Sequence, residues 1–439
     1  MSLTQAGDEV GTTPPRALAT VFAIVFIDLL GFGIIIPILP FYVRSFGASD
    51  VYIGLLAASY SLMQFLSAPL LGRISDERGR RPILLLSVAG SAIAWTLFGL
   101  GGSLLVLFVS RMLAGAMGGN IATAQAYVAD VTPPERRAAA LGLIGASFGL
   151  GFVFGPAIGG LFASDPVVTA ARDGLPRFVP VTPFSLPSFA AAGLSLVNFL
   201  FAAVFLRETG APRPSPVGRV SWFGQFTDAL RDERLRGLVV SFLLLSLAFS
   251  GVQVMFIPFA ADAYGYVESQ TALLLTYVGV LGVVVQGGLV GPLSARYADT
   301  TLAMVGAACL AVALATIPFA PALGRALLPP VGGPAFLTPE LLALLLVLPL
   351  LSVGNGLLSV TLNTLVSKNA SASMQGNAFG VTQSAGSLGR TIGPPIMASL
   401  YALVAYWSPF VVGSVLVVPI VTIVARLARG YLTSDPTER

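Results

Sequence analysis

Long apolar stretches separated by short polar ones fill the chain from residue 17 to residue 428. Stretches of about 20 residues are long enough to cross roughly 30 Å of hydrocarbon as helices. Six lie before a polar segment at 207–236, near 17–43, 52–71, 83–101, 104–129, 139–164 and 188–206. Six follow it, near 237–262, 270–294, 300–320, 340–367, 375–403 and 409–428. The pattern predicts an all-α polytopic membrane protein with twelve transmembrane helices.

The composition agrees with a membrane protein, because 55% of the residues are hydrophobic and only 10% are charged. A soluble domain carries charge on roughly a quarter of its residues. The net charge of +4 does not indicate nucleic acid, since the arginines are scattered over short loops rather than gathered on one face. We therefore attribute the basic balance to membrane topology.

Several classes of protein are disfavoured by what the sequence lacks. It has no histidine, a single cysteine (Cys309) and no phosphate-binding loop ending in Gly-Lys-Ser/Thr. We therefore expect no enzyme, no metal site, no cofactor and no ATP-driven pump. The first fifteen residues hold no lysine or arginine, unlike a secretory signal peptide, so the first apolar run is expected to be retained.

Arginines set the predicted orientation, because short loops rich in arginine stay on the inner side of a bilayer. The loops assigned to the outer side hold only Arg44, Arg172, Arg177 and Arg325. Both termini are thus predicted to be cytoplasmic. The predicted parts are an N-terminal tail (1–16), a six-helix bundle (17–206), a cytoplasmic connector (207–236), a second six-helix bundle (237–428) and a C-terminal tail (429–439).

The connector is rich in arginine and proline, and its second part has a helical pattern. Trp222, Phe223, Phe226 and Leu230 share one face opposite charged residues, which predicts a helix lying in the membrane interface. A plain solvated linker is the alternative.

The two halves resemble each other, which predicts two pseudo-symmetric bundles. Gly151, Gly155 and Pro156 match Gly389, Gly393 and Pro394 at a constant offset, and Gly159 and Gly160 extend the first copy. Glycines allow close helix approach and proline bends a helix, so we expect a bend that serves motion. Static packing is the alternative.

Several motifs carry a resemblance to a known family. Gly72, Asp76, Gly79, Arg80 and Arg81 match the loop signature of the major facilitator superfamily. The stretches DLLGFGIIIPILP (28–40), RMLAGAMGGNIATAQAYVADVTPPERR (111–137) and GASFGLGFVFGPAIGG (145–160) resemble drug–proton antiporters of the tetracycline-efflux type. Tetracycline exporters also place carboxylates in their third and ninth helices, whereas here 87–100 and 301–319 contain no acid. The cargo therefore stays open.

The resemblance implies that the loop at 72–82 latches neighbouring helix ends in the outward-open state. Asp76 and Arg80 are four residues apart, and a carboxylate near a helix start is favourable. Asp130 and Arg137 are expected to join the same cytoplasmic charge network. Topology signalling by arginine alone is the alternative.

Asp28 lies about a dozen residues into the first predicted helix, and it is the only acid deep in any span. An ionised carboxylate there costs about 2.5–3.5 kcal/mol on insertion scales, so the group is suited to gaining and losing a proton. The repeat places Phe249 at the equivalent position, so the fold does not itself demand an acid. Asp28 is predicted to couple protons or contact cargo, and a structural ion pair is the alternative.

Two arginines also lie within spans. For Arg111 the resemblance implies a role in proton coupling, with an interhelical hydrogen-bond anchor as the alternative. Arg390 interrupts the eleventh helix and should point into the bundle, toward a carboxylate, a carbonyl or an anionic cargo. Polar stripes at helical spacing complete a predicted substrate cavity, although such residues also hydrogen-bond between helices. The cavity set is Tyr60, Gln64, Asn120, Thr123, Tyr127, Ser250, Gln253, Asn355, Ser359, Gln383, Ser387 and Arg390.

These features predict a proton-driven secondary transporter that exports a lipophilic or amphipathic small molecule by alternating access. We expect a monomer in the plasma (inner) membrane, in contact with lipid, protons and cargo, in a role such as multidrug efflux and antibiotic resistance. One alternative is a proton symporter or uniporter that imports a metabolite. Another is a membrane receptor or scaffold of the same fold that transports nothing.

Overall fold

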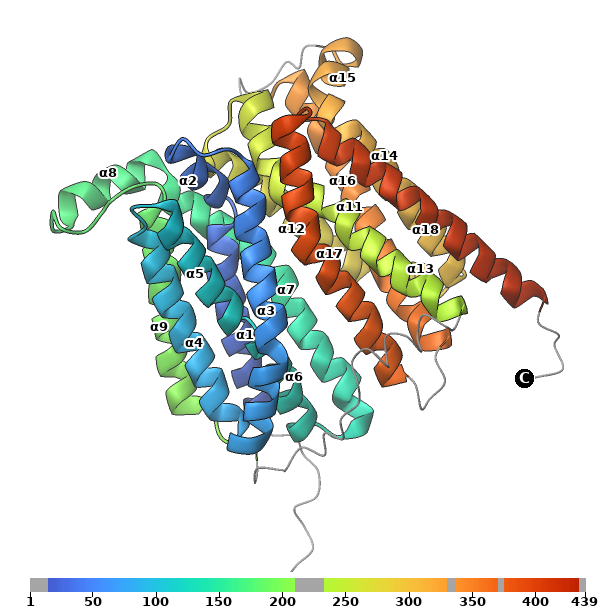
Figure 1. Ribbon diagram of the computed structural model, residues 1–439, viewed down its shortest axis with the longest axis horizontal. Helices are drawn as coiled ribbons and strands as arrows, with labels where there is room; N and C mark the ends of the chain where they lie inside the picture. Colours follow the sequence, from blue (N-terminus) through green and yellow to red (C-terminus); the bar gives the residue numbers. More distant parts are fainter. Residues whose placement is uncertain (1–14, 210–232, 330–336, 370–374, 434–439) are drawn as a thin grey trace, which may run out of the picture. The chain divides into compact units, whose positions relative to one another are not determined.

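A computed structural model describes residues 15–209, 233–329, 337–369 and 375–433 (Figure 1). Within these ranges the chain is helical and forms no strand. The predicted N-terminal tail lies almost entirely outside the described residues, as does most of the connector with its predicted interfacial helix. The predicted C-terminal tail is described as far as Thr433, where α18 ends.

The described chain divides into two compact units. The first comprises residues 15–36 and 62–209, and the second comprises residues 37–61 together with everything from 233 onward. This division differs from the predicted bundle at 17–206 in one respect, because residues 37–61 group with the C-terminal unit. Each unit is a set of long helices that run roughly parallel (Figure 1).

The first unit is built from helices separated by short turns. Its helices are α1 (Pro15–Ile35), the second part of α3 (Val51–Arg78), α4 (Arg80–Gly99), α5 (Leu104–Met117), α6 (Asn120–Val131), α7 (Pro134–Ala163), α8 (Asp165–Gly174) and α9 (Ser185–Phe205). Two of the breaks have local causes. Ser103 caps α5 by accepting a hydrogen bond from the Val106 amide, and Gly118 and Gly119 form the turn that splits the fourth span into α5 and α6.

The second unit contains α2 (Leu39–Ser45), the first part of α3 and all later helices. These are α11 (Glu233–Tyr264), α12 (Glu268–Val284), the π-helical turn η1 (Val285–Leu289), α13 (Val290–Ser294), α14 (Asp299–Thr316), the 3₁₀ turn η2 (Ile317–Phe319), α15 (Ala320–Leu327), α16 (Pro339–Asn369), α17 (Gln375–Leu403) and α18 (Ser408–Thr433). The first span is broken between α1 and α2, where Pro37 lies in the turn.

Eleven segments of the described chain are long and apolar enough to cross a membrane. They correspond to the predicted spans except the eleventh. That span is α17, which has 29 residues but carries many glycine, serine and threonine residues and Arg390. With α17 added, the helices are consistent with the predicted twelve.

Both units pack their helices in the same pattern. In the first unit α1 packs on α7 and α4 on α9, and in the second α11 packs on α17 and α14 on α18. These pairs join the first span to the fifth and the third to the sixth of each half. Helix α14 also packs closely on α16, as α4 does on α5 and α6. The equivalence predicted from the glycine motifs is therefore present in the packing of each unit.

Candidate functional site

Asp28 lies in α1 and is partly buried against two neighbouring helices. Nδ2 of Asn120, the first residue of α6, donates a hydrogen bond to Oδ2 of Asp28 over 3.1 Å. The side chain of Ser91 in α4 also hydrogen-bonds the Asp28 carboxyl group. No lysine or arginine among the described residues forms an ion pair with Asp28. The carboxyl group is thus held by neutral partners, which can bind it in either protonation state.

Arg111 lies in α5, is buried and stacks on an aromatic ring of α1. Its guanidinium carbon is 5.6 Å from the centroid of the Phe32 ring, which places the cation over the ring face. Phe32 in turn packs edge-on against Phe152 of α7, with ring centroids 6.4 Å apart. Arg111 therefore lies against α1, the helix that carries Asp28.

The other predicted cavity residues on α3 and α6 have separate surroundings. Gln64 of α3 donates from Nε2 to the carbonyl of Gly118 over 3.0 Å, at the turn between α5 and α6. Thr123 is buried, and its hydroxyl has no hydrogen-bond partner among the described residues. Tyr127 is buried, and its hydroxyl donates to the Arg207 carbonyl over 3.0 Å. Tyr60 lies on α3, within the second unit, and is partly buried.

In the second unit, Arg390 is the charged residue among those predicted to line the cavity. Its side chain is exposed, and Nη2 donates to Oγ of Ser387, one turn earlier, over 2.9 Å. No carboxylate among the described residues pairs with it. Gln383 is exposed on the same face, two turns from Arg390. This face of α17 therefore presents a guanidinium with spare donors.

The remaining predicted residues of that unit differ in exposure. Ser250 of α11 is buried and donates to the carbonyl of Ser246, in its own helix. Asn355 and Ser359 are partly buried on α16, and Gln253 is exposed on α11.

The glycine motifs lie where two helices cross in each unit. A β-carbon at Gly155 of α7 would lie 2.6 Å from the Cα of Gly33 in α1, and one at Gly33 would lie 2.6 Å from the Gly151 carbonyl oxygen. At the equivalent crossing, a β-carbon at Gly389 of α17 would lie 2.6 Å from Cβ of Ser246 in α11. Gly159 and Gly393 meet the same partner helices. The helices α7 and α17 continue through Pro156 and Pro394, so the motif forms a close crossing within a continuous helix.

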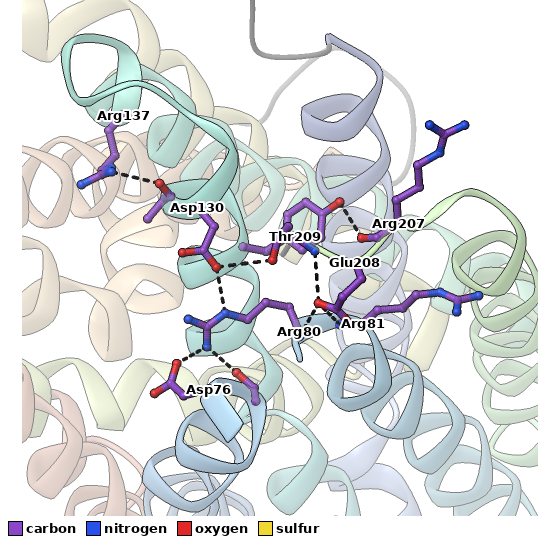
Figure 2. Close-up of polar contacts among 11 residues, drawn as sticks. Asp76, Arg80, Arg81, Asp130, Arg137, Arg207, Glu208 and Thr209 are labelled. Atoms are coloured by element: carbon purple, nitrogen blue, oxygen red, sulfur yellow. Dashed lines mark hydrogen bonds and ion pairs between the residues drawn. The ribbon is translucent and has the colours of Figure 1, made fainter. Parts of the chain in front are cut away.

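The loop predicted as a latch forms a charge cluster, which we call the latch cluster: Asp76, Arg80 and Asp130 with their direct partners. Figure 2 shows the Arg80 guanidinium between the two carboxylates, with Nε 3.0 Å from Oδ2 of Asp130 and Nη1 paired with Asp76. Nη1 also donates to Oγ of Ser75 over 2.6 Å. These contacts tie the end of α3 and the start of α4 to the end of α6.

The other predicted latch residues have distinct roles. Gly79 adopts φ +98°, which favours glycine and allows the sharp turn between α3 and α4. Arg81 donates from Nη2 to the carbonyl of Ala203 in α9 over 2.7 Å. Arg137 donates to the Ala129 carbonyl over 3.0 Å and so joins the end of α6 to α7 (Figure 2). A β-carbon at Gly72 would meet nothing within 4 Å, so packing does not explain that glycine.

The second unit contains an ion pair between its third and fourth spans, where the first unit has Arg80 and Asp130, but the positive and negative residues have exchanged places. Asp299, the first residue of α14, accepts a bond from Nζ of Lys368 near the end of α16 over 2.5 Å. In the first unit the cation starts the third span and the anion ends the fourth, and here the anion comes first. The loop at 291–299 occupies the place of the 72–82 loop in the second half, and its last residue, Asp299, makes a counterpart of the Arg80–Asp130 contact.

A second charge cluster, which the sequence reasoning missed, lies at the other end of α3; we call it the Arg44 cluster. Arg44 of α2 binds Asp50 through Nε and Nη2, both at 2.8 Å, and binds Asp262 of α11 through Nη1 at 2.7 Å and Nη2 at 2.9 Å. The hydroxyl of Tyr401 in α17 donates to the Asp262 carboxylate over 2.7 Å. The cluster fastens residues 37–61 to α11 and α17. The one sequence feature that pointed to this cluster was Arg44 itself, because it lies in a predicted outer loop and such loops hold few arginines.

The sequence model of the Major Facilitator Superfamily matches residues 21–394 of the chain. The chain belongs to the Major Facilitator Superfamily. Among known members, the tetracycline resistance protein, class C, of Escherichia coli is 30% identical over 392 residues, or 88% of this chain and 90% of that protein. Major facilitator superfamily domain-containing protein 10 of Mus musculus is 28% identical over 444 residues, or 91% and 90% of the two chains.

Solved structures of this superfamily share the fold. A bacterial homolog of the human lysosomal transporter Spinster, in an inward-facing and unoccupied conformation, superposes with a TM-score of 0.75 at 17% identity, covering 97% of this chain and all of that one. The human organic anion transporter MFSD10 (TETRAN) gives a TM-score of 0.65 at 23% identity, covering 93% and 99%. The chain is a multi-pass integral membrane transporter of this superfamily and not an enzyme.

Proposed function

We propose that this transporter exports a lipophilic or amphipathic small molecule in exchange for protons. The observation that carries the proposal is Asp28, a carboxyl group inside the first span whose described partners, Asn120 and Ser91, are neutral. The tetracycline resistance proteins that it resembles over about nine-tenths of their length support efflux as the direction of transport.

The contacts of Asp28 explain how a proton can be taken up and released there. A carboxylate locked by a guanidinium stays ionised, because the opposite charge stabilises the ionised form. An amide and a hydroxyl can each donate to the ionised form and accept from the protonated one. Asp28 can therefore exchange its proton without leaving a buried ion pair broken.

We further propose that Arg111 supports this exchange. Its positive charge lies over Phe32, one helical turn from Asp28 on α1. At that position it contributes a fixed charge whose effect on Asp28 is electrostatic. The protein needs no cofactor, since the proton gradient supplies the energy, and we propose that it acts as a monomer in the plasma (inner) membrane.

Transport of organic anions is a second candidate, and Arg390 favours it. The guanidinium is exposed and donates to Ser387 within the described chain, so further donors are available for a carboxylate or sulfonate. The human organic anion transporter MFSD10 has the same fold. The two candidates are compatible if an amphipathic cargo carries an acidic group.

Flux into proteoliposomes with an imposed pH gradient tests the proposal. Tetracycline and a lipophilic carboxylate dye serve as probes, each with and without the gradient. We expect Asp28→Asn to abolish gradient-driven flux of any probe that the wild-type protein carries, while the yield of folded protein stays the same. Arg390→Ala is expected to weaken binding of the acidic dye about tenfold or more, and binding of neutral probes little.

A matched control removes the same charge elsewhere. Asp173 of α8 is exposed, and Asp173→Asn should leave flux unchanged. Adding a carried probe to purified protein should release protons for an exchanger, whereas a symporter would take protons up. Gradient-driven flux that survives in Asp28→Asn would refute the assignment of that carboxyl group.

A further inference from the structure

The end of α9 and the first residues of the connector, 207–209, are fastened to the latch cluster and its neighbours by several hydrogen bonds. The carbonyls of Ala203 and Arg207 accept bonds from Arg81 and Tyr127. The hydroxyl of Thr209 donates to Oδ2 of Asp130 over 3.4 Å, and this oxygen also binds Arg80. Residues 203–209 therefore lie against α4 and α6 at the cluster itself (Figure 2).

Glu208 makes the central contact of this segment. Its Oε1 accepts a bond from the Arg80 amide over 2.8 Å, and its Oε2 accepts one from the Arg81 amide over 3.1 Å. These are amides of the first turn of α4, which lack partners inside the helix. A carboxylate at this position satisfies them and is also favoured by the helix dipole.

The shape of the turn fits this contact. A β-carbon at Gly79 would lie 2.5 Å from Oε2 of Glu208, so the carboxylate occupies the space that a larger residue would fill. The glycine before the two arginines is thus required both for its backbone angle and for the approach of Glu208. No side chain of α4 itself caps this helix start.

Arg80 is bound at two points as a result. Glu208 holds its amide, while Asp76 and Asp130 hold its guanidinium. Fixing the backbone of Arg80 restricts where the guanidinium can reach, which orients it between the two carboxylates.

We propose that Glu208 is a positioning residue of the latch, and that the start of the connector is one of its working parts. The inference rests on the proposed transport cycle, in which the latch cluster must form and release. A change in the path of the connector then alters the latch directly, because Glu208, the second residue of the connector, holds the Arg80 amide. The connector therefore both links the two halves and holds the backbone of Arg80.

Hydrogen–deuterium exchange of the full-length protein in lipid nanodiscs tests this without any cargo. In Glu208→Ala we expect exchange to rise about tenfold at residues 80–83, where the cap is lost, and also at 127–132, where Asp130 loses an oriented partner. Glu208→Gln keeps one acceptor oxygen and should show a smaller rise at both places. Asp130→Asn combined with Glu208→Ala should add little at 127–132 beyond Asp130→Asn alone.

The control is Glu77→Gln, an exposed acid on the last turn of α3 that pairs with Arg73 and lies outside the cluster. It should leave exchange at both places unchanged. A rise confined to 80–83 would show that Glu208 caps α4 and does nothing more, which overturns the proposal.

Transport gives the second measurement. For a probe that the wild-type protein carries, Glu208→Ala should lower the maximal rate about tenfold and change KM less than twofold, since the latch acts on the cycle and not on cargo binding. An effect of Glu208→Ala that appears as a raised KM, with the maximal rate unchanged, would count against this positioning role. The exchange result stands by itself if no proton-driven flux is found, so failure of the proposed function and failure of this inference are distinguishable.

Discussion

Single residues decide how closely the helices of each unit approach. Gly33 and Gly155 bring the backbones of α1 and α7 into contact, and α1 carries both Asp28 and the Phe32 ring that faces Arg111. The glycines thus set the distance between α7 and the helix that holds the proposed proton site. Interfaces of small residues are typical of membrane helices because packing, rather than the hydrophobic effect, drives their association.

A substitution at the crossing should therefore cost stability. Gly155→Ala places a methyl group 2.6 Å from Cα of Gly33, and we expect a loss of about 1–3 kcal/mol from overpacking. Gly142→Ala, on the same helix, meets nothing within 4 Å and should be neutral or slightly stabilising. Thermal unfolding of the two purified variants in one detergent compares them. Equal melting temperatures would contradict the crossing described here.

The sequence predicted several of these residues but not which of them meet. Asp28 and Asn120 were each proposed separately, and the hydrogen bond between them joins positions 92 residues apart. That pairing depends on how α1 and α6 are rotated against each other, which helical periodicity within one segment does not determine. Tyr127 was predicted from a polar stripe next to Asn120, whereas its hydroxyl binds the carbonyl of Arg207.

At the scale of helices, the Arg44 cluster connects α2, α3, α11 and α17. Its two carboxylates are 6 and 218 residues from the arginine, so no local motif reveals it. The charge pair of the latch cluster, by contrast, was predictable because Asp76 and Arg80 are one helical turn apart in a recognisable loop. Asp130 was also expected, and its bond to Arg80 places it in the cluster.

The Tyr401 hydroxyl is the simplest part of the Arg44 cluster to remove. Tyr401→Phe deletes one bond to the Asp262 carboxylate, and we expect a loss of about 1 kcal/mol, reduced by the partial exposure of that carboxylate. Tyr406→Phe is the control, since Tyr406 is exposed and its ring packs on Phe259. Thermal unfolding should rank Tyr401→Phe below Tyr406→Phe, and the reverse order would contradict the cluster.

At the scale of the whole chain, apolar length and repeat were sufficient to predict the class of fold. Apolar length is a weaker criterion for the eleventh span, because α17 is more polar than the other eleven, although the stretch 375–403 was predicted as one of the apolar spans. Apolar length also does not show that the first and fourth spans are each broken into two helices. Those breaks lie at Pro37 and at the Gly118–Gly119 pair.

Orientation remains a prediction of the arginine count, and it is directly measurable. Reporter fusions at the C-terminus and in the loop after Gly174 should report opposite sides of the membrane, with the C-terminus in the cytoplasm. Biotin-maleimide labelling of intact cells, with a cysteine introduced near the C-terminus, gives an independent measurement. Labelling of the C-terminus from outside would reverse the assignment of the latch cluster to the cytoplasmic side.

The π-helical turn η1 affects how the eighth span is aligned with the eighth span of other superfamily members. A turn with bonds from residue i to i+5 holds one more residue than an α-helical turn. One added residue rotates every later side chain by about 100° around the axis. Side chains of α12 and α13 consequently follow two different phases of the helical wheel. An alignment that treats 270–294 as one uninterrupted α-helix will therefore pair residues with the wrong partners, shifted by one position, on one side of Gly287 and Gly288.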